Sequence, residues 1–422
     1  MTIRYGIRWD GRGRPKLLRT AALGLAAIAF AFPAAARAQD ASDAAAAASM
    51  QRISGGSGIK PGAADGTGVD VALIDSGVVP VGGLAQPGRV VHGPDFSDER
   101  GDRRLATLDT FGHGTHLAGL ITGRDPVTGF AGVAPGARLV SVKIAGADGE
   151  TSLARVLAAL EWVRRNRNAD GMNIRVVNLS LGVEDRGDYR HDLLAWAVEQ
   201  LWRDGIAVVA AAGNNGIGAD RLDIPAADPF VIAAGATDTR DTVTPVDDRV
   251  ADFSSRSVFR TPDVVAPGSR IVSLRVPGSA LDEEFPGARV GTRYFRGSGT
   301  SQAAAVVTGL AARLLSEHPD LSPDQLKALL TAGAVDLPDP RHADGAGRVD
   351  LAGSLAAPVP DAESVRQTWL PARLDPRALL RALRAGREEY AAGDAEWSGR
   401  RWSGRRWSGR RWSGASWVDA KH

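Results

Sequence analysis

The chain has 422 residues, of which 44% are hydrophobic, with 50 glycines and 23 prolines, and this suits one large globular domain with appendages. It contains no cysteine, which excludes disulfides, thiolate nucleophiles and cysteine-ligated metal sites. The net charge of +2 is unevenly spread, because residues 1–38 and 397–422 each carry +6 and residues 39–396 therefore carry −10. The high isoelectric point thus comes from the two ends, and the acidic body predicts no specific nucleic-acid partner.

The first 38 residues are predicted to be an export signal. Several basic residues precede an apolar run at 21–32, and Ala36-Arg37-Ala38 offers small residues where a signal peptidase cuts. An uncleaved anchor or a buried helix is the alternative, although twelve apolar residues are few for a bilayer span. We therefore expect a secreted or cell-envelope protein. Its short N-terminal extension, residues 39–65, leaves no room for a large folding propeptide.

From residue 66 onward, strand and helix patterns alternate. Continuous apolar, β-branched runs separated by helical patterns predict an α/β fold with a mostly parallel central sheet and helices on both faces. In such sheets the site lies outside the carboxyl ends of the strands. Strands are expected at 69–74, 138–144, 174–180, 206–212 and 230–234. Helices are expected at 115–123, 153–167 and 193–204.

Four polar residues stand at turns where strands end or helices begin. Asp75 follows the first strand, His113 opens a small-residue helix, Asn214 sits on a glycine turn and Ser301 opens an alanine- and valine-rich helix. Each has a purely structural interpretation, as a turn residue or a helix cap. Together, and in this order, they favour chemistry, because a serine at a helix N-terminus with little bulk around it is open to a substrate carbonyl.

Seven segments in sequence resemble the motifs of the subtilisin-like serine peptidases (subtilases). They are VALIDSGV, DTFGHGTHLAGLITG, GVAPGARLVSVKI, VVNLSLG, VVAAAGNNG, VVAPG and GSGTSQAAAVVTG. The resemblance implies a peptidase domain at 66–356 and the family's chain order of Asp, His and Ser. It implies Ser301 as nucleophile, His113 as general base, Asp75 as the residue that holds His113, and Asn214 as oxyanion donor. His116, one turn along the same helix, is expected to be structural.

The resemblance also implies a specificity pocket. Its two flanking segments are Ser180-Leu181-Gly182 and Ala211-Ala212-Gly213. Asp223 stands where the family often has glycine on the pocket floor, and a carboxylate there predicts a preference for Lys or Arg before the cleaved bond. Glu184 and Asp185 would add to the negative field. The alternative is that Asp223 points to solvent or pairs with Arg221.

Two departures from the family pattern bear on the site. The family's Met after the serine is replaced by Gln302, and its Pro three residues further on by Ala305, a change that relaxes the first turn of the helix. The loop 123–135 occupies the place of a family calcium loop, but Pro126 stands where an amide ligand is usual. We therefore expect no metal and no cofactor.

Past residue 356 the composition changes. Residues 357–395 are predicted to be a linker with one helix at 376–390, and residues 396–422 repeat Trp-Ser-Gly-Arg-Arg and hold five of the ten tryptophans. A five-residue period fits neither helix nor strand, so one interpretation is a tail with no ordered role. The other is retention on an anionic cell-envelope polymer or a glycan, since tryptophan and arginine suit stacking and cation–π contact.

The sequence as a whole predicts a secreted, monomeric serine endopeptidase that acts on protein or peptide substrates. Two alternatives stay open at this point. The domain could be a catalytically weak or inactive binding module, or it could act mainly as an esterase on small substrates, because the same triad cleaves esters.

Overall fold

The structure is a computed structural model that describes residues 41–55, 58, 64–182, 188–218, 221–368 and 371–373. The predicted signal, most of the linker with its helix, and the repeat tail lie outside the described residues. Among the residues described, no helix has both the length and the apolar character needed to cross a bilayer.

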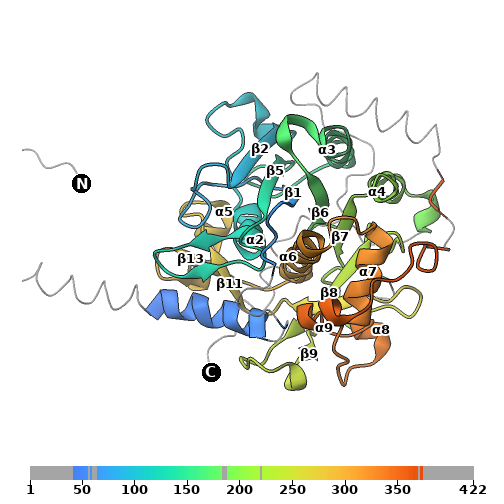
Figure 1. The fold of residues 1–422 in the computed structure, drawn as a ribbon. Coiled ribbons are helices and arrows are strands. Elements are labelled where there is room, and N and C mark those ends of the chain that lie inside the picture. The colour runs from blue at the N-terminus through green and yellow to red at the C-terminus, as the bar shows by residue number, and fades with distance from the viewer. Residues whose placement is uncertain are drawn as a thin grey trace, which may run out of the picture. The chain divides into compact units, whose positions relative to one another are not determined.

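A parallel sheet forms the centre of the fold (Figure 1). Its strand order is β10-β8-β7-β6-β1-β5-β2, and the short β9 adds antiparallel to β8. These strands are β1 (Asp70–Asp75), β2 (Val90–Asp95), β5 (Arg138–Lys143), β6 (Ile174–Leu179), β7 (Ala207–Ala211), β8 (Ile232–Asp238), β9 (Arg249–Val250) and β10 (Val264–Pro267). The predicted α/β class and the five expected strands are confirmed, with shifts of one to four residues at their ends. The register pairs Asp75 at the end of β1 with Lys143 at the end of β5.

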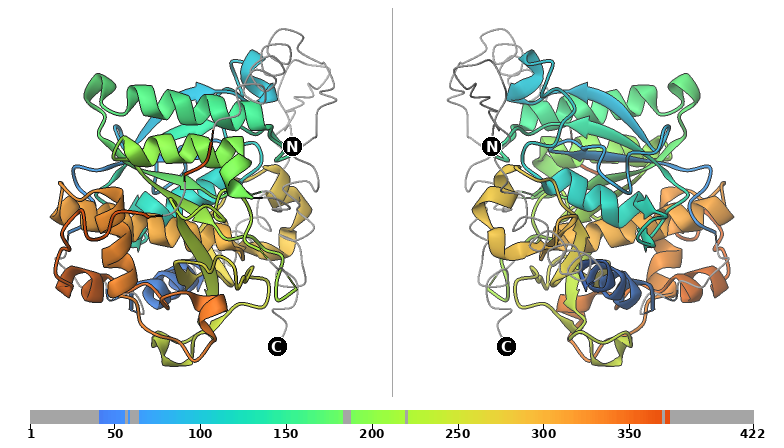
Figure 2. Two further views of the ribbon diagram at one scale, coloured as in Figure 1. Left: turned by 90° about the vertical axis from the view of Figure 1, so that its right-hand side faces the viewer. Right: turned by 90° about the vertical axis from the view of Figure 1, so that its left-hand side faces the viewer.

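Helices cover both faces of this sheet, and Figure 2 shows the two layers from the side. One apolar core lies between the sheet and helices α3 and α4, and a larger core lies between the sheet and helices α2 and α6. The helices are α2 (His113–Thr122), α3 (Leu153–Asn166), α4 (Leu193–Arg203), α5 (Ala280–Glu284), α6 (Thr300–Glu317), α7 (Pro323–Ala332), α8 (Arg341–Asp344) and α9 (Leu351–Ala356). The three helices expected from sequence are confirmed, although α2 begins two residues earlier than expected, at His113.

Two smaller sheets complete the fold. A three-stranded antiparallel sheet has the order β11-β13-β12, and a two-stranded hairpin pairs β3 with β4. Their strands are β3 (Arg124–Asp125), β4 (Phe130–Ala131), β11 (Ile271–Leu274), β12 (Arg289–Val290) and β13 (Tyr294–Gly297).

The N-terminal extension contributes a helix to the larger core. Residues 42–55 are helical, and Ala46, Met50 and Ile53 are buried at three- and four-residue spacing, which places them on one face. The Ser49 hydroxyl accepts a hydrogen bond of 2.9 Å from the backbone N–H of Val272 in β11. This part of the extension is thus built into the domain.

Part of the expected linker also lies on the domain. The Gln325 side chain in α7 donates to the Pro360 carbonyl at 2.9 Å. The backbone N–H of Ala372 donates to the carboxylate of Glu199 in α4, and Ala372 is buried. The chain therefore follows the domain surface at least to residue 373 before the tail begins.

Candidate active site

Asp75 and His113 form a buried pair at the carboxyl edge of the sheet. Asp75 is the last residue of β1 and His113 the first of α2. The Asp75 Oδ1 lies 2.7 Å from the His113 Nδ1, and their side chains are 1% and 0% exposed. A Cβ on Gly114 would stand 2.2 Å from the Gly77 carbonyl oxygen, so only glycine lets the helix approach the turn after β1 this closely.

A second buried carboxylate, Asp109, supports this pair. Its oxygens accept hydrogen bonds from the Ser76 hydroxyl at 2.8 Å and from the backbone N–H groups of Gly112 and Thr115 at 2.6 and 2.7 Å. The Ser76 hydroxyl in turn accepts from the Gly114 N–H at 3.0 Å. Burial raises the pKa of Asp109, while these donors oppose the shift. Sequence reasoning passed over Asp109, and its place four residues before the histidine was the available signal.

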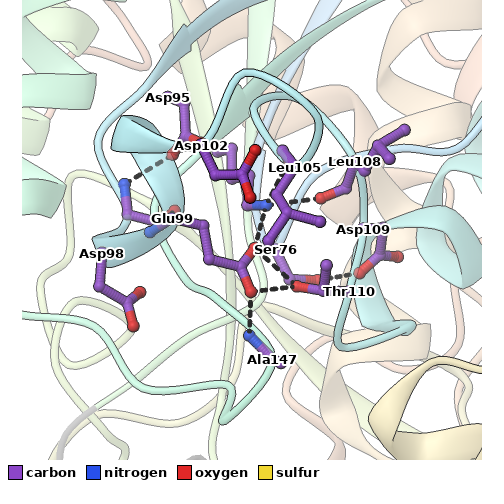
Figure 3. Close-up of polar contacts among 12 residues, drawn as sticks. Ser76, Asp95, Asp98, Glu99, Asp102, Leu105, Leu108, Asp109, Thr110 and Ala147 are labelled. Carbon is purple, nitrogen blue, oxygen red and sulfur yellow. Dashed lines mark hydrogen bonds and ion pairs between the residues drawn. The ribbon is translucent and has the colours of Figure 1, made fainter.

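Lys143, the last residue of β5, holds the loop that leads to α2 through contacts with Glu99, Leu105 and Leu108, which are labelled in Figure 3. Its side chain is 1% exposed, and its Nζ lies 2.6 Å from the Glu99 Oε2. The Nζ also donates to the carbonyls of Leu105 and Leu108, and Glu99 accepts from Thr110 and from the Ala147 N–H. Because Lys143 is the register partner of Asp75, this ion pair anchors the 98–110 loop beside the site. Sequence reasoning did not find it.

Ser301 lies in the first turn of α6, a helix that packs against α2. Its hydroxyl donates to the Ser180 carbonyl at 3.3 Å, and the Ser180 hydroxyl donates back to the Ser301 carbonyl at 3.1 Å. Asn178 donates to the Ser180 hydroxyl at 2.8 Å and accepts from Thr308 at 2.9 Å. The expected nucleophile is thus hydrogen-bonded directly to Ser180, in one of the two expected pocket segments.

Asn214 is oriented by Thr300. Its Oδ1 accepts hydrogen bonds from the Thr300 N–H at 2.9 Å and from the Thr300 hydroxyl at 3.0 Å. The amide nitrogen, Nδ2, therefore points away from Thr300. A Cβ built on Gly299 would stand 3.5 Å from the Asn214 Nδ2 and 3.7 Å from the Ser301 backbone nitrogen. The two expected oxyanion donors therefore lie around one point. The Gln302 Oε1 is 2.9 Å from that same point.

Asp223 lies between the two expected pocket segments. A Cβ on Gly182 would stand 2.8 Å from the Asp223 Cβ, and a Cβ on Gly213 would stand 2.6 Å from the Asp223 Oδ2. The Asn215 amide donates to the Asp223 Oδ1 at 2.7 Å. Arg221, the expected alternative partner, places its guanidinium 5.6 Å from the centre of the Phe259 ring. Glu184 and Asp185 lie outside the described residues.

Two other features that the sequence singled out are the loop 123–135 and His116. The loop 123–135 contains the β3–β4 hairpin, and its Asp125 pairs with Arg293 at 2.7 Å. Within the described ranges, no three His, Asp or Glu side chains are grouped to hold a metal. His116 is buried, which lowers its pKa to about 3, so it stays neutral at working pH.

A cavity of about 820 Å³ lies at the opposite, amino-terminal edge of the sheet. Its lining includes Ile174 and Ile206, which lie where β6 and β7 begin, and Trp202, whose indole donates to Asp324 at 2.9 Å. It contains none of the residues expected to react, which all lie at the carboxyl edge.

Comparisons with known proteins match this arrangement. The model of the Subtilase family matches residues 66–348. Serine protease AprX of Bacillus subtilis (strain 168) is 37% identical over 301 residues, covering 69% of this chain and 66% of AprX. Subtilisin DY of Bacillus licheniformis is 32% identical over 276 residues, covering 65% of this chain and 86% of that protein. The chain thus spans just under two thirds of AprX.

Solved structures give the same result. Fervidolysin from Fervidobacterium pennivorans, a keratinolytic enzyme related to subtilisin, superposes with a TM-score of 0.55 at 29% identity, covering 70% of this chain and 44% of that one. A cold-adapted subtilisin-like serine proteinase superposes with a TM-score of 0.51 at 30% identity, covering 68% of this chain and 88% of that one.

Proposed function

This chain belongs to the subtilase family of serine peptidases, and we propose that it is a serine endopeptidase with Asp75, His113 and Ser301 as its catalytic triad. The observation that carries the proposal is the buried contact of 2.7 Å between Asp75 and His113. A carboxylate on Nδ1 holds the imidazole with Nε2 as the basic nitrogen and stabilises the imidazolium that forms.

In the proposed reaction, the Ser301 Oγ attacks the substrate carbonyl carbon while His113 Nε2 takes the hydroxyl proton. The oxyanion accepts hydrogen bonds from the Asn214 Nδ2 and the Ser301 N–H, and losing one such donor costs about 2.7–4 kcal/mol, a value measured on subtilisin itself. His113 then gives its proton to the leaving amine as the peptide bond breaks. A water molecule then attacks the acyl group while His113 takes a proton from it. His113 passes this proton to the Ser301 Oγ as the carboxyl product leaves.

A fluorophosphonate probe tests this proposal directly. We expect it to label Ser301 in the wild-type chain, and labelling followed by loss of casein hydrolysis would support a reactive nucleophile. The absence of labelling in a folded protein would favour the inactive binding module. Casein zymography beside a nitrophenyl ester assay separates the remaining alternative, because a mainly esterolytic enzyme would leave casein intact.

We further propose that Asp223 gives the enzyme a preference for Lys or Arg before the cleaved bond. Support comes from its contacts with Gly182 and Gly213, one in each pocket segment. A partly desolvated carboxylate favours a cation as its neighbour. A peptide library that varies this position decides: equal cleavage after Leu, Phe and Arg, unchanged in Asp223→Gly, would remove the preference.

Export through residues 1–38 and retention through residues 396–422 complete the proposal. The tail carries a charge opposite to that of the body, which suits an anionic cell-envelope polymer or a glycan as its partner, and we take the enzyme to be a monomer. Deleting 397–422 should leave hydrolysis of soluble peptides intact and move the protein from the cells to the medium. Unchanged partitioning would contradict retention.

A further inference from the structure

The carboxylate of Asp223 is partly exposed between two backbone segments of the proposed substrate site. Its Oδ1 is held by the Asn215 amide at 2.7 Å, and its backbone N–H donates to the Ala212 carbonyl at 3.0 Å. The glycines at 182 and 213 admit the carboxylate because any side chain there would collide with it. A carboxylate held in place beside these two backbone segments is an acceptor of the kind that the planar guanidinium of arginine pairs with.

A second group of carboxylates lies along the same edge of the sheet. Asp98, Asp148 and Glu150 are exposed, and the loop that carries the latter two follows β5. Asp98 reaches this loop, since a Cβ on Gly146 would stand 2.6 Å from its Oδ1. Partial desolvation of its carboxylate raises the pKa of Asp148, and the neighbouring charges of Asp98 and Glu150 add to the increase. Arg155 lies 3.7 Å from Asp98 and offsets part of this charge. The group of three carboxylates and one guanidinium is still net negative, and a negative group on this side of the sheet favours a basic peptide.

The chain itself contains such a peptide. The repeat tail has three arginine pairs, each followed by tryptophan: Arg400-Arg401, Arg405-Arg406 and Arg410-Arg411. Arg401 lies 28 residues beyond Arg373, the last described residue. That length spans roughly 90 Å when extended, several times the radius of gyration of about 20 Å expected for a domain of this size. The tail can therefore enter its own site or that of a second molecule.

We propose that these arginine pairs are a substrate of the enzyme's own active site, an inference that rests on the proposed endopeptidase function. The scissile bonds are those from arginine to tryptophan, for example between Arg401 and Trp402. Ser301 takes the acyl group ending in Arg401, the amine of Trp402 leaves with the proton from His113, and water then returns the free carboxylate of Arg401. Each cut removes basic charge from the enzyme and would end any retention that the tail provides.

Mass spectrometry of the C-terminus tests the inference in the full chain. After incubation, the wild-type protein should end at Arg401, Arg406 or Arg411, whereas Ser301→Ala should keep its tail. A variant with all six tail arginines changed to glutamine is the matched control, and it should keep its tail while hydrolysing casein normally. Loss of the tail in Ser301→Ala would assign the cut to another protease and overturn the inference.

A synthetic peptide covering residues 394–417, offered to enzyme that lacks 397–422, separates the two levels of the proposal. We expect cleavage after arginine, and in Asp223→Asn a fall in kcat/KM for this peptide of roughly 10- to 100-fold, as expected for the loss of a charge-assisted hydrogen bond. Hydrolysis of casein with this peptide intact would overturn the inference and leave the proposed function standing. Inactivity on both, without probe labelling, would overturn the proposed function as well.

Discussion

Two buried aspartates of this domain have partners of different chemistry. Asp75, 1% exposed, faces the imidazole of His113, whereas Asp248, 0% exposed, faces the guanidinium of Arg348 at 2.5 Å. An imidazole gains and loses a proton near neutral pH, but a guanidinium stays charged. Arg348 also donates to the Arg52 carbonyl at 3.1 Å and so ties the N-terminal helix to the domain. Burial of a carboxylate is common to both pairs, and the chemistry of the partner distinguishes the pair that we propose to be reactive from the pair that we expect to be structural.

The largest effect is expected at the reactive pair and its nucleophile. Ser301→Ala and His113→Ala should each lower kcat for peptide hydrolysis by more than about 10⁴-fold, because triad members act as a unit. Both variants should remain folded. Ser301→Ala should unfold at nearly the wild-type temperature, because it removes one hydroxyl group, whereas His113→Ala should unfold at a lower temperature, because the buried Asp75 carboxylate loses its imidazole partner and keeps, among the described residues, only its hydrogen bonds from Ser76. Turnover on casein and thermal unfolding check the prediction, and near-normal turnover in Ser301→Ala would contradict the assignment.

A change in the pair of Asp248 and Arg348 should lower stability and leave activity unchanged. Arg348→Met should lower the free energy of unfolding by about 3–5 kcal/mol, because Asp248 stays buried without its counter-ion. Hydrolysis per folded molecule should be unchanged. Arg341→Met is the matched control: that arginine is exposed and lies 3.9 Å from Asp336, so its loss should cost less than about 0.5 kcal/mol. Urea titrations of the three proteins give the comparison, and equal stabilities would exclude a structural role for the buried pair.

A third buried carboxylate, that of Asp228, is expected to make the stability of the domain depend on pH. Burial raises its pKa to about 8, far above its value in the unfolded chain, so the native state binds an extra proton between about pH 4 and 8. Its contribution to stability is complete below pH 4 and is lost as the pH rises through 8. Asp228→Asn removes this dependence. Between pH 5 and pH 7 the stability of the wild type relative to the variant should fall by up to about 3 kcal/mol, measured by urea unfolding; a constant difference would show that Asp228 is charged throughout.

The smallest effect concerns Gln302, a fully buried amide whose Nε2 and Oε1 have no hydrogen-bond partner in the described part of the chain. An unsatisfied buried amide is costly, and an apolar group of similar shape is neutral or better. Gln302→Met should therefore raise the free energy of unfolding by about 1 kcal/mol and make activity sensitive to peroxide, since a thioether would then lie beside Ser301. Urea denaturation measures the change in stability, and residual activity after peroxide treatment measures the sensitivity to oxidation. A variant that is destabilised and resists peroxide would show that the Gln302 amide has hydrogen-bond partners in solution.

Much of this protein could be predicted from local patterns in its sequence. Short apolar runs such as 174–180 and 206–212 indicated buried parallel strands because their periodicity is a property of neighbouring residues. The same strands predicted which edge would hold the site. Asp75, His113 and Asn214 could be singled out because each follows a strand or opens a helix within a few residues. The family motifs then supplied their proposed roles.

Contacts between residues that are distant in the chain could not be predicted from the sequence. The exchange of hydrogen bonds between Ser180 and Ser301 spans 121 positions, and Arg348 reaches the Arg52 carbonyl across 296. Asp223 could be placed near a pocket by alignment, but its packing against Gly182 and Gly213 depends on how three loops meet. Local periodicity does not predict such long-range contacts. They depend on the order of the strands in the sheet and on the side chains that fill the space between the sheet and its helices.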